Sequence, residues 1–322
     1  MLKLRLLTGF VVCSVVFGVL FFLPAWTHMI LILLVFLLAQ WEFNAMVRDS
    51  GHQYELLATT ICGAALLLAT ALESPLVADL RIRFTWVPNI AAAAPGDGGF
   101  DFSLLPAGKG RMDLTGIILS LTPALLLACG VFRRRTKQAM ETFALSFAGF
   151  WYVAVLLSFI IRISFEWRVH EDWSTNYTGR LMLLLFIVLV KVGDVGGYTF
   201  GRLFGRHKLI PEISPNKTVE GLFGEYVFSL SAGLLMWAVF HHFFQGWFGQ
   251  TQFKFVHAVV LPPLLTTTGV LGDLAESLIK RSVGVKDSSS RFPGMGGILD
   301  ILDSLLFSAP FMYAYMLLFE FK

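Results

Sequence analysis

The sequence predicts an all-α polytopic integral membrane protein with about nine transmembrane helices. Hydrophobic residues make up 56% of the 322 positions, charged residues make up only 15%, and the mean hydropathy is +0.70. Apolar runs recur along the chain at a length of about 20 residues, which a helix needs to cross a hydrocarbon core about 30 Å thick. This composition excludes an ordinary soluble domain. The net charge of +3 is too small to predict a nucleic-acid partner.

The first apolar run follows Lys3 and Arg5, an arrangement that signal peptides share with first membrane spans. A second run begins almost at once, which favours an uncleaved first span. The expected spans are residues 6–24, 28–46, 55–73, 113–132, 143–163, 181–200, 222–243, 255–274 and 300–319. We expect two regions. Residues 1–175 hold five spans and an outside loop at 74–112, and residues 176–322 hold four spans and two cytoplasmic motif loops.

Basic residues are distributed unequally between alternate loops. Placing the N-terminus in the cytoplasm puts most of the 25 lysines and arginines in cytoplasmic segments, as the positive-inside rule requires. The C-terminus is then outside. The cluster Arg133–Arg135 with Lys137 reads most simply as an orientation signal, and contact with anionic lipid head groups is the alternative. Both motif loops face the cytoplasm in this orientation, where nucleotides are available.

Acidic residues gather where the eighth expected span ends and the ninth begins. Four polar residues at positions i, i+3, i+4 and i+7 share one helix face: Asp273, Glu276, Ser277 and Lys280. Asp300 and Asp303 lie three apart at the start of the last span, after a loop rich in Gly, Ser and Pro. Carboxylates beside a membrane span are costly unless they are paired or hold a cation. Hard oxygen ligands in this number suit Mg²⁺, whose remaining sites substrate phosphates can fill.

A second polar block begins in the sixth expected span. Lys191 and Asp194 lie three apart and can form an ion pair, which is either structural or part of a polar cavity. The following residues, up to Gly221, are rich in glycines and basic side chains. We expect a loop that binds phosphates there, although the GxxxxGK[ST] pattern of a Walker A loop is absent. The alternative is a basic loop that only sets the topology.

These two blocks resemble the motifs of the phosphatidate cytidylyltransferases, or CDP-diacylglycerol synthases. The first block is similar to S-x-x-K-R-x(4)-K-D, then P-G-H-G-G and D-R-x-D, through Ser277, Lys280, Arg281, Lys286, Asp287, Pro293, Gly294, Gly296, Gly297, Asp300 and Asp303. The second is similar to D-x-x-A-Y-x-x-G-R-x-x-G and S-P-x-K-T-x-E-G, through Asp194, Tyr198, Gly201, Arg202, Gly205, Ser214, Pro215, Lys217, Thr218, Glu220 and Gly221. Met295 stands where the family usually has His, Ile301 where it has Arg, and Gly197 where Ala is common.

The resemblance implies transfer of a cytidylyl group from CTP to phosphatidic acid, giving CDP-diacylglycerol and pyrophosphate. It implies a Mg²⁺ ion, with a second cation as an option, held by Asp273, Asp300 and Asp303, with Glu276 as a weaker candidate. The same three aspartates and Lys280 would be catalytic. Expected substrate-binding residues are Arg202, Lys217, Thr218, Ser277, Arg281, Lys286 and Asp287. The resemblance further implies a homodimer. We expect it in the plasma membrane of a bacterium, with the active site facing the cytoplasm as the distribution of basic residues indicates, and with no nucleic-acid partner.

Two other functions remain as alternatives. A CTP-dependent lipid kinase would transfer the γ-phosphoryl group to a polyprenol or another lipid alcohol, and an Asp or Glu would serve as its base. A cation transporter would use Lys191, Asp194 and Asp273 as an ion path. The acidic residues gather at one edge of the membrane rather than along a path across it, which argues against transport.

Overall fold

The computed structural model describes residues 14–23, 25–73, 113–133, 138–165, 177–243, 253–285, 288–289 and 296–319. Its helices are α2 (Ala25–Asp49), α3 (Leu56–Glu73), α5 (Leu114–Phe132), α6 (Ala139–Gly149), the π-helical η3 (Phe150–Val155), α7 (Leu156–Phe165), α8 (Tyr177–Phe204), α9 (Val219–Phe243), α10 (Phe255–Ser282) and α11 (Ile298–Leu318). Two short strands are β1 (Lys208–Ile210) and β2 (Ser214–Thr218).

The all-α membrane fold is confirmed. In the described part, eight helical stretches are long and apolar enough to cross a membrane, with α6, η3 and α7 counting as one. They correspond to the second through ninth expected spans. Residues 6–13 and 24 of the first expected span, 6–24, lie outside the described residues, and residues 14–22 of it are helical. The expected outside loop at 74–112 also lies outside the described residues.

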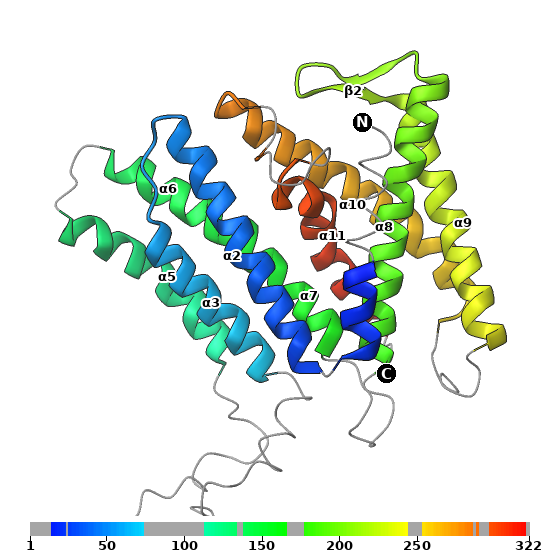
Figure 1. Cartoon of the computed structure of the whole chain (residues 1–322), viewed down its shortest axis with the longest axis horizontal. Coiled ribbons are helices and arrows are strands. Elements are labelled where there is room, and N and C mark those ends of the chain that lie inside the picture. The colour runs from blue at the N-terminus through cyan, green and yellow to red at the C-terminus, as the bar shows by residue number, and fades with distance from the viewer. Residues whose placement is uncertain are drawn as a thin grey trace, which may run out of the picture.

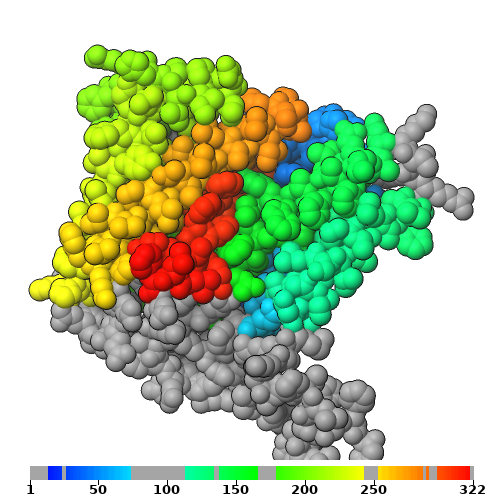
Figure 2. All heavy atoms as spheres, turned by 180° about the vertical axis from the view of Figure 1, so that it is seen from behind, coloured from blue at the N-terminus to red at the C-terminus, as the bar shows by residue number. Residues whose placement is uncertain are grey.

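The helices pack with α10 and α11 in the middle of the bundle (Figure 1). Helices α2, α3, α5, α6 and α7 lie on one side of this pair, and α8 and α9 lie on the other. The view from behind agrees, with α10 crossing the face between α9 and the helices α6 and α7 (Figure 2). One buried apolar core runs through both halves of the chain and includes Phe36, Phe150, Phe186 and Leu261.

Large apolar side chains also cover the outside of the bundle. Leu125 and Phe132 on α5 and Leu235 on α9 are exposed, which suits helices whose outer faces meet lipid. The turn after α2, the hairpin after α8 and the end of α10 all lie at one end of the molecule (Figure 1). The spans therefore alternate in direction as the expected topology requires.

Helices α8 and α10 extend beyond the expected spans, and each is 28 residues long. The sixth span was expected to end at residue 200. Residues 201–204, expected at the start of the phosphate-binding loop, belong instead to α8, which continues to Phe204. A Cβ atom on Gly196 would lie 2.4 Å from the carbonyl oxygen of Gly224, and one on Gly224 would lie 2.4 Å from Cβ of Phe200. Glycine here lets α8 and α9 pack closely, as small residues do between membrane helices.

The segment between α8 and α9 forms a β-hairpin, which the sequence analysis did not predict. Strands β1 and β2 are antiparallel, with Lys208 opposite Thr218. The Glu220 carboxylate accepts hydrogen bonds from the backbone N–H groups of Arg206 (3.0 Å) and His207 (3.2 Å). Thr218 accepts a hydrogen bond at its hydroxyl from the N–H of Gly221 (3.1 Å), which caps the start of α9. These contacts fix the hairpin relative to both helices.

Candidate functional site

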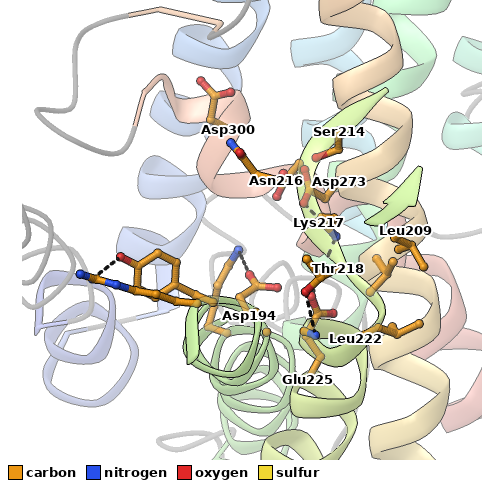
Figure 3. A pocket seen from close by; sticks show the side chains of 18 of the residues that line it. Asp194, Leu209, Ser214, Asn216, Lys217, Thr218, Leu222, Glu225, Asp273 and Asp300 are labelled. Carbon is orange, nitrogen blue, oxygen red and sulfur yellow. Dashed lines mark hydrogen bonds and ion pairs between the residues drawn. The ribbon is translucent and has the colours of Figure 1, made fainter. Parts of the chain in front are cut away.

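A cavity of about 630 Å³ lies at the hairpin end of the bundle, between α8, β1, β2, α9, α10 and α11. Figure 3 shows side chains from these elements pointing toward one another around it. Its lining residues are Lys191, Asp194, Gly197, Tyr198, Gly201, Arg202, Leu209, Ser214, Asn216, Lys217, Thr218, Gly221, Leu222, Glu225, Val270, Asp273, Lys280, Asp300 and Asp303. All of them lie between residues 191 and 303, the region that holds the two polar blocks found in the sequence. The two motif blocks therefore meet in one site.

Lys217 connects the hairpin to the acidic face of α10. Its Nζ lies 2.9 Å from Oδ2 of Asp273 and 4.0 Å from Oε1 of Glu225, and Figure 3 shows it pointing between the two. Burial disfavours the charged lysine, but the carboxylates of Asp273 and Glu225 outweigh that effect and raise the pKa of Lys217. Lys217 therefore presents a fixed positive charge in the cavity at neutral pH.

Three carboxylates form a compact group beside this lysine. Asp273, Glu276 and Asp303 each offer one oxygen, and these oxygens lie within 4.8 Å of one another. Glu276 and Asp303 are buried, with 1% and 8% of their surfaces exposed. Oε1 of Glu276 is buried without a hydrogen-bond partner in the described part of the chain. Like charges this close, with an unsatisfied oxygen among them, fit a divalent cation.

Asp300 has a different environment from these three residues. Its Oδ1 accepts a hydrogen bond from Nζ of Lys280 (2.5 Å), and its Oδ2 accepts from the N–H groups of Ser288 (3.0 Å) and Gly297 (2.7 Å). Lys280 also donates to Oε2 of Glu276 (2.6 Å). Asp300, which was expected to hold the cation with Asp273 and Asp303, thus contacts Lys280 and the start of α11. Glu276, the weaker candidate, lies with Asp273 and Asp303 instead.

The ion pair expected in the sixth span is confirmed. Nζ of Lys191 lies 2.9 Å from Oδ2 of Asp194 and donates a hydrogen bond to the hydroxyl of Ser304 on α11 (2.8 Å). Ser304 in turn donates to Asp194 (3.2 Å). Both charged residues line the cavity, so the pair joins α8 to α11 and also contributes polar groups to the site.

The other expected substrate-binding residues lie at several places. Arg202 lines the cavity and donates a hydrogen bond to the hydroxyl of Tyr198 (3.2 Å). Thr218 lines the cavity as well, with its hydroxyl capping α9. Ser277 is buried and donates to Asp273 (3.4 Å), and Arg281 is exposed and donates to a backbone carbonyl; neither lines the cavity. Two further expected residues lie outside the described residues: Lys286 and Asp287.

Glu225 is a cavity residue that the sequence analysis did not single out. It lies on α9 four residues after Gly221 and, like Asp194, lines the cavity (Figure 3). A Cβ atom on Gly197 would lie 2.4 Å from Oε1 of Glu225, so a glycine at that position makes room for this carboxylate. An acid within a membrane span is itself a signal of a functional site, and that signal was available in the sequence.

Comparison with known proteins gives a consistent result. A phosphatidate cytidylyltransferase of Bacillus subtilis is 33% identical over 217 residues, which cover 67% of this chain and 75% of that protein. One of Staphylococcus saprophyticus is 33% identical over 233 residues, covering 72% and 80%. One of Haemophilus influenzae is 37% identical over 160 residues, covering 50% of this chain and 52% of that protein.

The match to a family model extends further than these pairwise alignments. The model, described as the cytidylyltransferase family, matches residues 3–319. That range contains every residue that lines the cavity and all three grouped carboxylates. Since the match runs through nearly the whole chain and its polar site, the chain belongs to the cytidylyltransferase family.

Proposed function

We propose that this chain transfers the cytidylyl group of CTP to phosphatidic acid, giving CDP-diacylglycerol and pyrophosphate. The observation that carries the proposal is the arrangement of the cavity, where grouped carboxylates stand beside Lys217 and Lys280 at one end of membrane-spanning helices. A cavity of about 630 Å³ is in the usual range for small-molecule sites. The family match and the names of the bacterial relatives support the same reaction.

In this reaction an oxygen of the lipid phosphate attacks the α-phosphorus of CTP. The bond from that phosphorus to the oxygen bridging to the β-phosphate breaks, and pyrophosphate leaves. Phosphate monoesters are largely dianionic at pH 7, since their second pKa is about 6, so the nucleophile needs no strong protein base. The protein must instead align two anions that repel each other and offset the charge on the leaving group.

The residues of the cavity suit these tasks. Lys217 and Lys280 are held in place by carboxylates and supply fixed positive charge for phosphate oxygens. Arg202, at the cavity wall, would orient one of the phosphates through its planar guanidinium. Acids outnumber bases here, so binding two anionic substrates calls for additional positive charge.

Magnesium fits that requirement. We propose that Asp273 and Asp303 hold it together with Glu276, whose Oε1 is buried without a partner in the described residues. Asp300 would act by holding Lys280 unless it moves away from that lysine. When bound, Mg²⁺ would supply neutralisation of the phosphate charge that grows as pyrophosphate leaves.

The lipid would reach this cavity from the bilayer. Leu209, Leu222 and Val270 are among the lining residues, so the wall of the cavity is partly apolar. Phosphatidic acid would place its phosphate among the polar groups and keep its acyl chains between the helices and the surrounding lipid. In this arrangement the nucleotide approaches from the cytoplasm of a bacterial cell.

A labelling experiment tests the proposal. Purified protein in detergent with phosphatidic acid receives CTP labelled either at the α- or at the γ-phosphate, and the extracted lipid is counted. We expect only the α-label in the lipid, with release of one pyrophosphate for each lipid labelled. The γ-label in lipid would identify a CTP-dependent lipid kinase. No label in lipid from either nucleotide would contradict both enzymes and leave cation transport to be measured.

A further inference from the structure

A buried carboxylate from the N-terminal half of the chain contacts the segment between α10 and α11. Glu42 lies seven residues before the end of α2, within a membrane span, and none of its surface is exposed. It does not line the cavity and contributes to neither of the two motif blocks. Burying a carboxylate in this position costs free energy unless its oxygens accept hydrogen bonds. The groups that donate those hydrogen bonds therefore indicate the role of Glu42.

In the described part of the chain, the Glu42 carboxylate accepts hydrogen bonds from residues more than 240 positions away, on the segment after α10 and in the first turn of α11. Its Oε1 accepts a hydrogen bond from the hydroxyl of Ser289 (2.7 Å). Its Oε2 accepts from the backbone N–H of Leu299 (3.1 Å) and from the hydroxyl of Ser288 (3.2 Å). One carboxylate therefore holds both the residues that follow α10 and the first turn of α11.

The contact with Leu299 satisfies a group that the helix itself leaves free. The first four N–H groups of a helix have no partner within that helix, and a negative charge near them is favourable. Asp300 serves one N–H at this helix start, that of Gly297, and Glu42 serves another, that of Leu299. Helix α11 is thus capped partly from within and partly by α2.

Gly297 provides an independent observation. A Cβ atom at this position would lie 2.1 Å from Oγ of Ser288 and 2.3 Å from Oε2 of Glu42. The φ angle of Gly297 is −96°, which any residue can adopt, so conformation does not require a glycine here. Lack of space favours a glycine, because the Ser288 hydroxyl and the Glu42 carboxylate together occupy the volume that a side chain would need.

The contacts continue from Glu42 into the cavity. The hydroxyl of Ser288 also reaches Oδ2 of Asp300 at 2.8 Å, and Oδ1 of Asp300 accepts from Lys280. A serine hydroxyl carries one proton, so it can donate to Glu42 or to Asp300 but not fully to both. Displacing Glu42 would therefore alter the hydrogen bonds of Asp300 and the direction of the helix that carries Asp303.

We propose that Glu42 is a positioning residue for the transfer site, acting through Ser288, Ser289 and the first turn of α11. The inference rests on the proposed function for its catalytic consequence, whereas the contacts themselves are independent of it. The N-terminal half then does more than complete the bundle, because α2 sets the geometry of a site whose lining residues all lie after position 190.

The test compares Glu42→Gln with a matched loss of a buried carboxylate, Glu55→Gln. Glu55 lies in the same half, is 2% exposed and pairs with Arg133 at 2.7 Å, away from the loop. Gln keeps the size of the side chain but replaces an accepting oxygen by a donating amide. Hydrogen exchange is measured on the full-length protein at Ser288, Ser289 and the first turn of α11. Initial rates are measured over a Mg²⁺ titration.

We expect Glu42→Gln to speed amide exchange in that segment about fivefold, the effect of losing a helix cap. The Mg²⁺ concentration for half-maximal rate should rise about tenfold, as it does when groups that orient metal ligands are removed. Glu55→Gln should change neither. Equal exchange in both variants, or an unchanged Mg²⁺ titration in Glu42→Gln, would overturn the proposal.

A milder variant keeps the test decisive if Glu42→Gln does not accumulate. Ser289→Ala removes one donor to Glu42 and leaves in place the hydrogen bonds that Asp300 accepts from Lys280, Ser288 and Gly297. It should show a smaller change in the same direction in both measurements, and wild-type behaviour in both would overturn the proposal. If the wild-type protein showed no cytidylyl transfer, the proposed function would be contradicted. The hydrogen-exchange measurement would still test the contacts of Glu42, because it does not depend on activity.

Discussion

Lys217 on strand β2 and Asp273 on α10 form an ion pair of 2.9 Å in the lining of the cavity. The two residues come from different motif blocks, 56 positions apart, and their pairing connects the hairpin to the group of carboxylates. The lysine therefore stands where it can meet a phosphate that approaches the carboxylates.

Replacing Lys217 by Ala should lower kcat/KM for CTP roughly 10- to 100-fold, the range expected for losing a hydrogen bond from a charged donor. Lys217→Arg should keep more activity because it retains the charge. Steady-state rates over a range of CTP concentrations provide the measurement. The control is Lys208→Ala, which removes an exposed lysine from the other strand of the hairpin. Equal losses in the Lys217 and Lys208 variants would contradict a direct role for Lys217.

Asp303 and Asp300 should respond differently to the same substitution. Asp303→Asn removes charge from the three-carboxylate group and should lower activity at least about 100-fold with little loss of stability, because like charges repel there. Asp300→Asn breaks the contact with Lys280 and weakens the start of α11. It should destabilise the protein by about 3 kcal/mol, as does breaking a buried pair.

Thermal unfolding in detergent and cytidylyl transfer, measured on the same preparations, separate these two roles. A loss of stability in Asp303→Asn as large as that in Asp300→Asn would mean that both aspartates are structural. Full activity in Asp303→Asn would rule out its place in the site.

The close packing of α8 and α9 gives a prediction that does not depend on catalysis. Gly196→Ala would bring a Cβ atom against the carbonyl oxygen of Gly224 and should destabilise the protein by about 1–3 kcal/mol. Gly130→Ala on α5 is the matched control, since no described atom lies within 4 Å of its added Cβ. That control should be neutral or slightly stabilising, by up to about 1 kcal/mol. Melting temperatures in detergent distinguish the two, and equal values would contradict the packing argument.

The spans and the acidic face of α10 could be predicted because both depend on local regularities. Membrane-spanning length follows from hydropathy, and the helical repeat puts Asp273, Glu276 and Lys280 on one face wherever the helix packs. The Lys191–Asp194 pair follows from the same spacing. The cytidylyltransferase family could be predicted because its motifs are long and specific.

Other features depend on contacts between distant parts of the chain. Glu276 lies with Asp273 and Asp303, and Asp300 contacts Lys280, because of how α10 packs against α11. Spacing along one helix does not determine this packing. Glu42 meets Ser288 across 246 residues, so its role is visible only in the fold. The hairpin strands are three and five residues long, too short for a periodic pattern to reveal them.

The position of a bound divalent cation tests the central claim most directly. Mn²⁺ can stand in for Mg²⁺, and its anomalous scattering would locate it in crystals of the full-length protein grown with CTP. We predict a peak within bonding distance of carboxylate oxygens from both Asp273 and Asp303, and no such peak in Asp303→Asn. A wild-type map with Mn²⁺ bound to the nucleotide but away from both carboxylates would contradict the account.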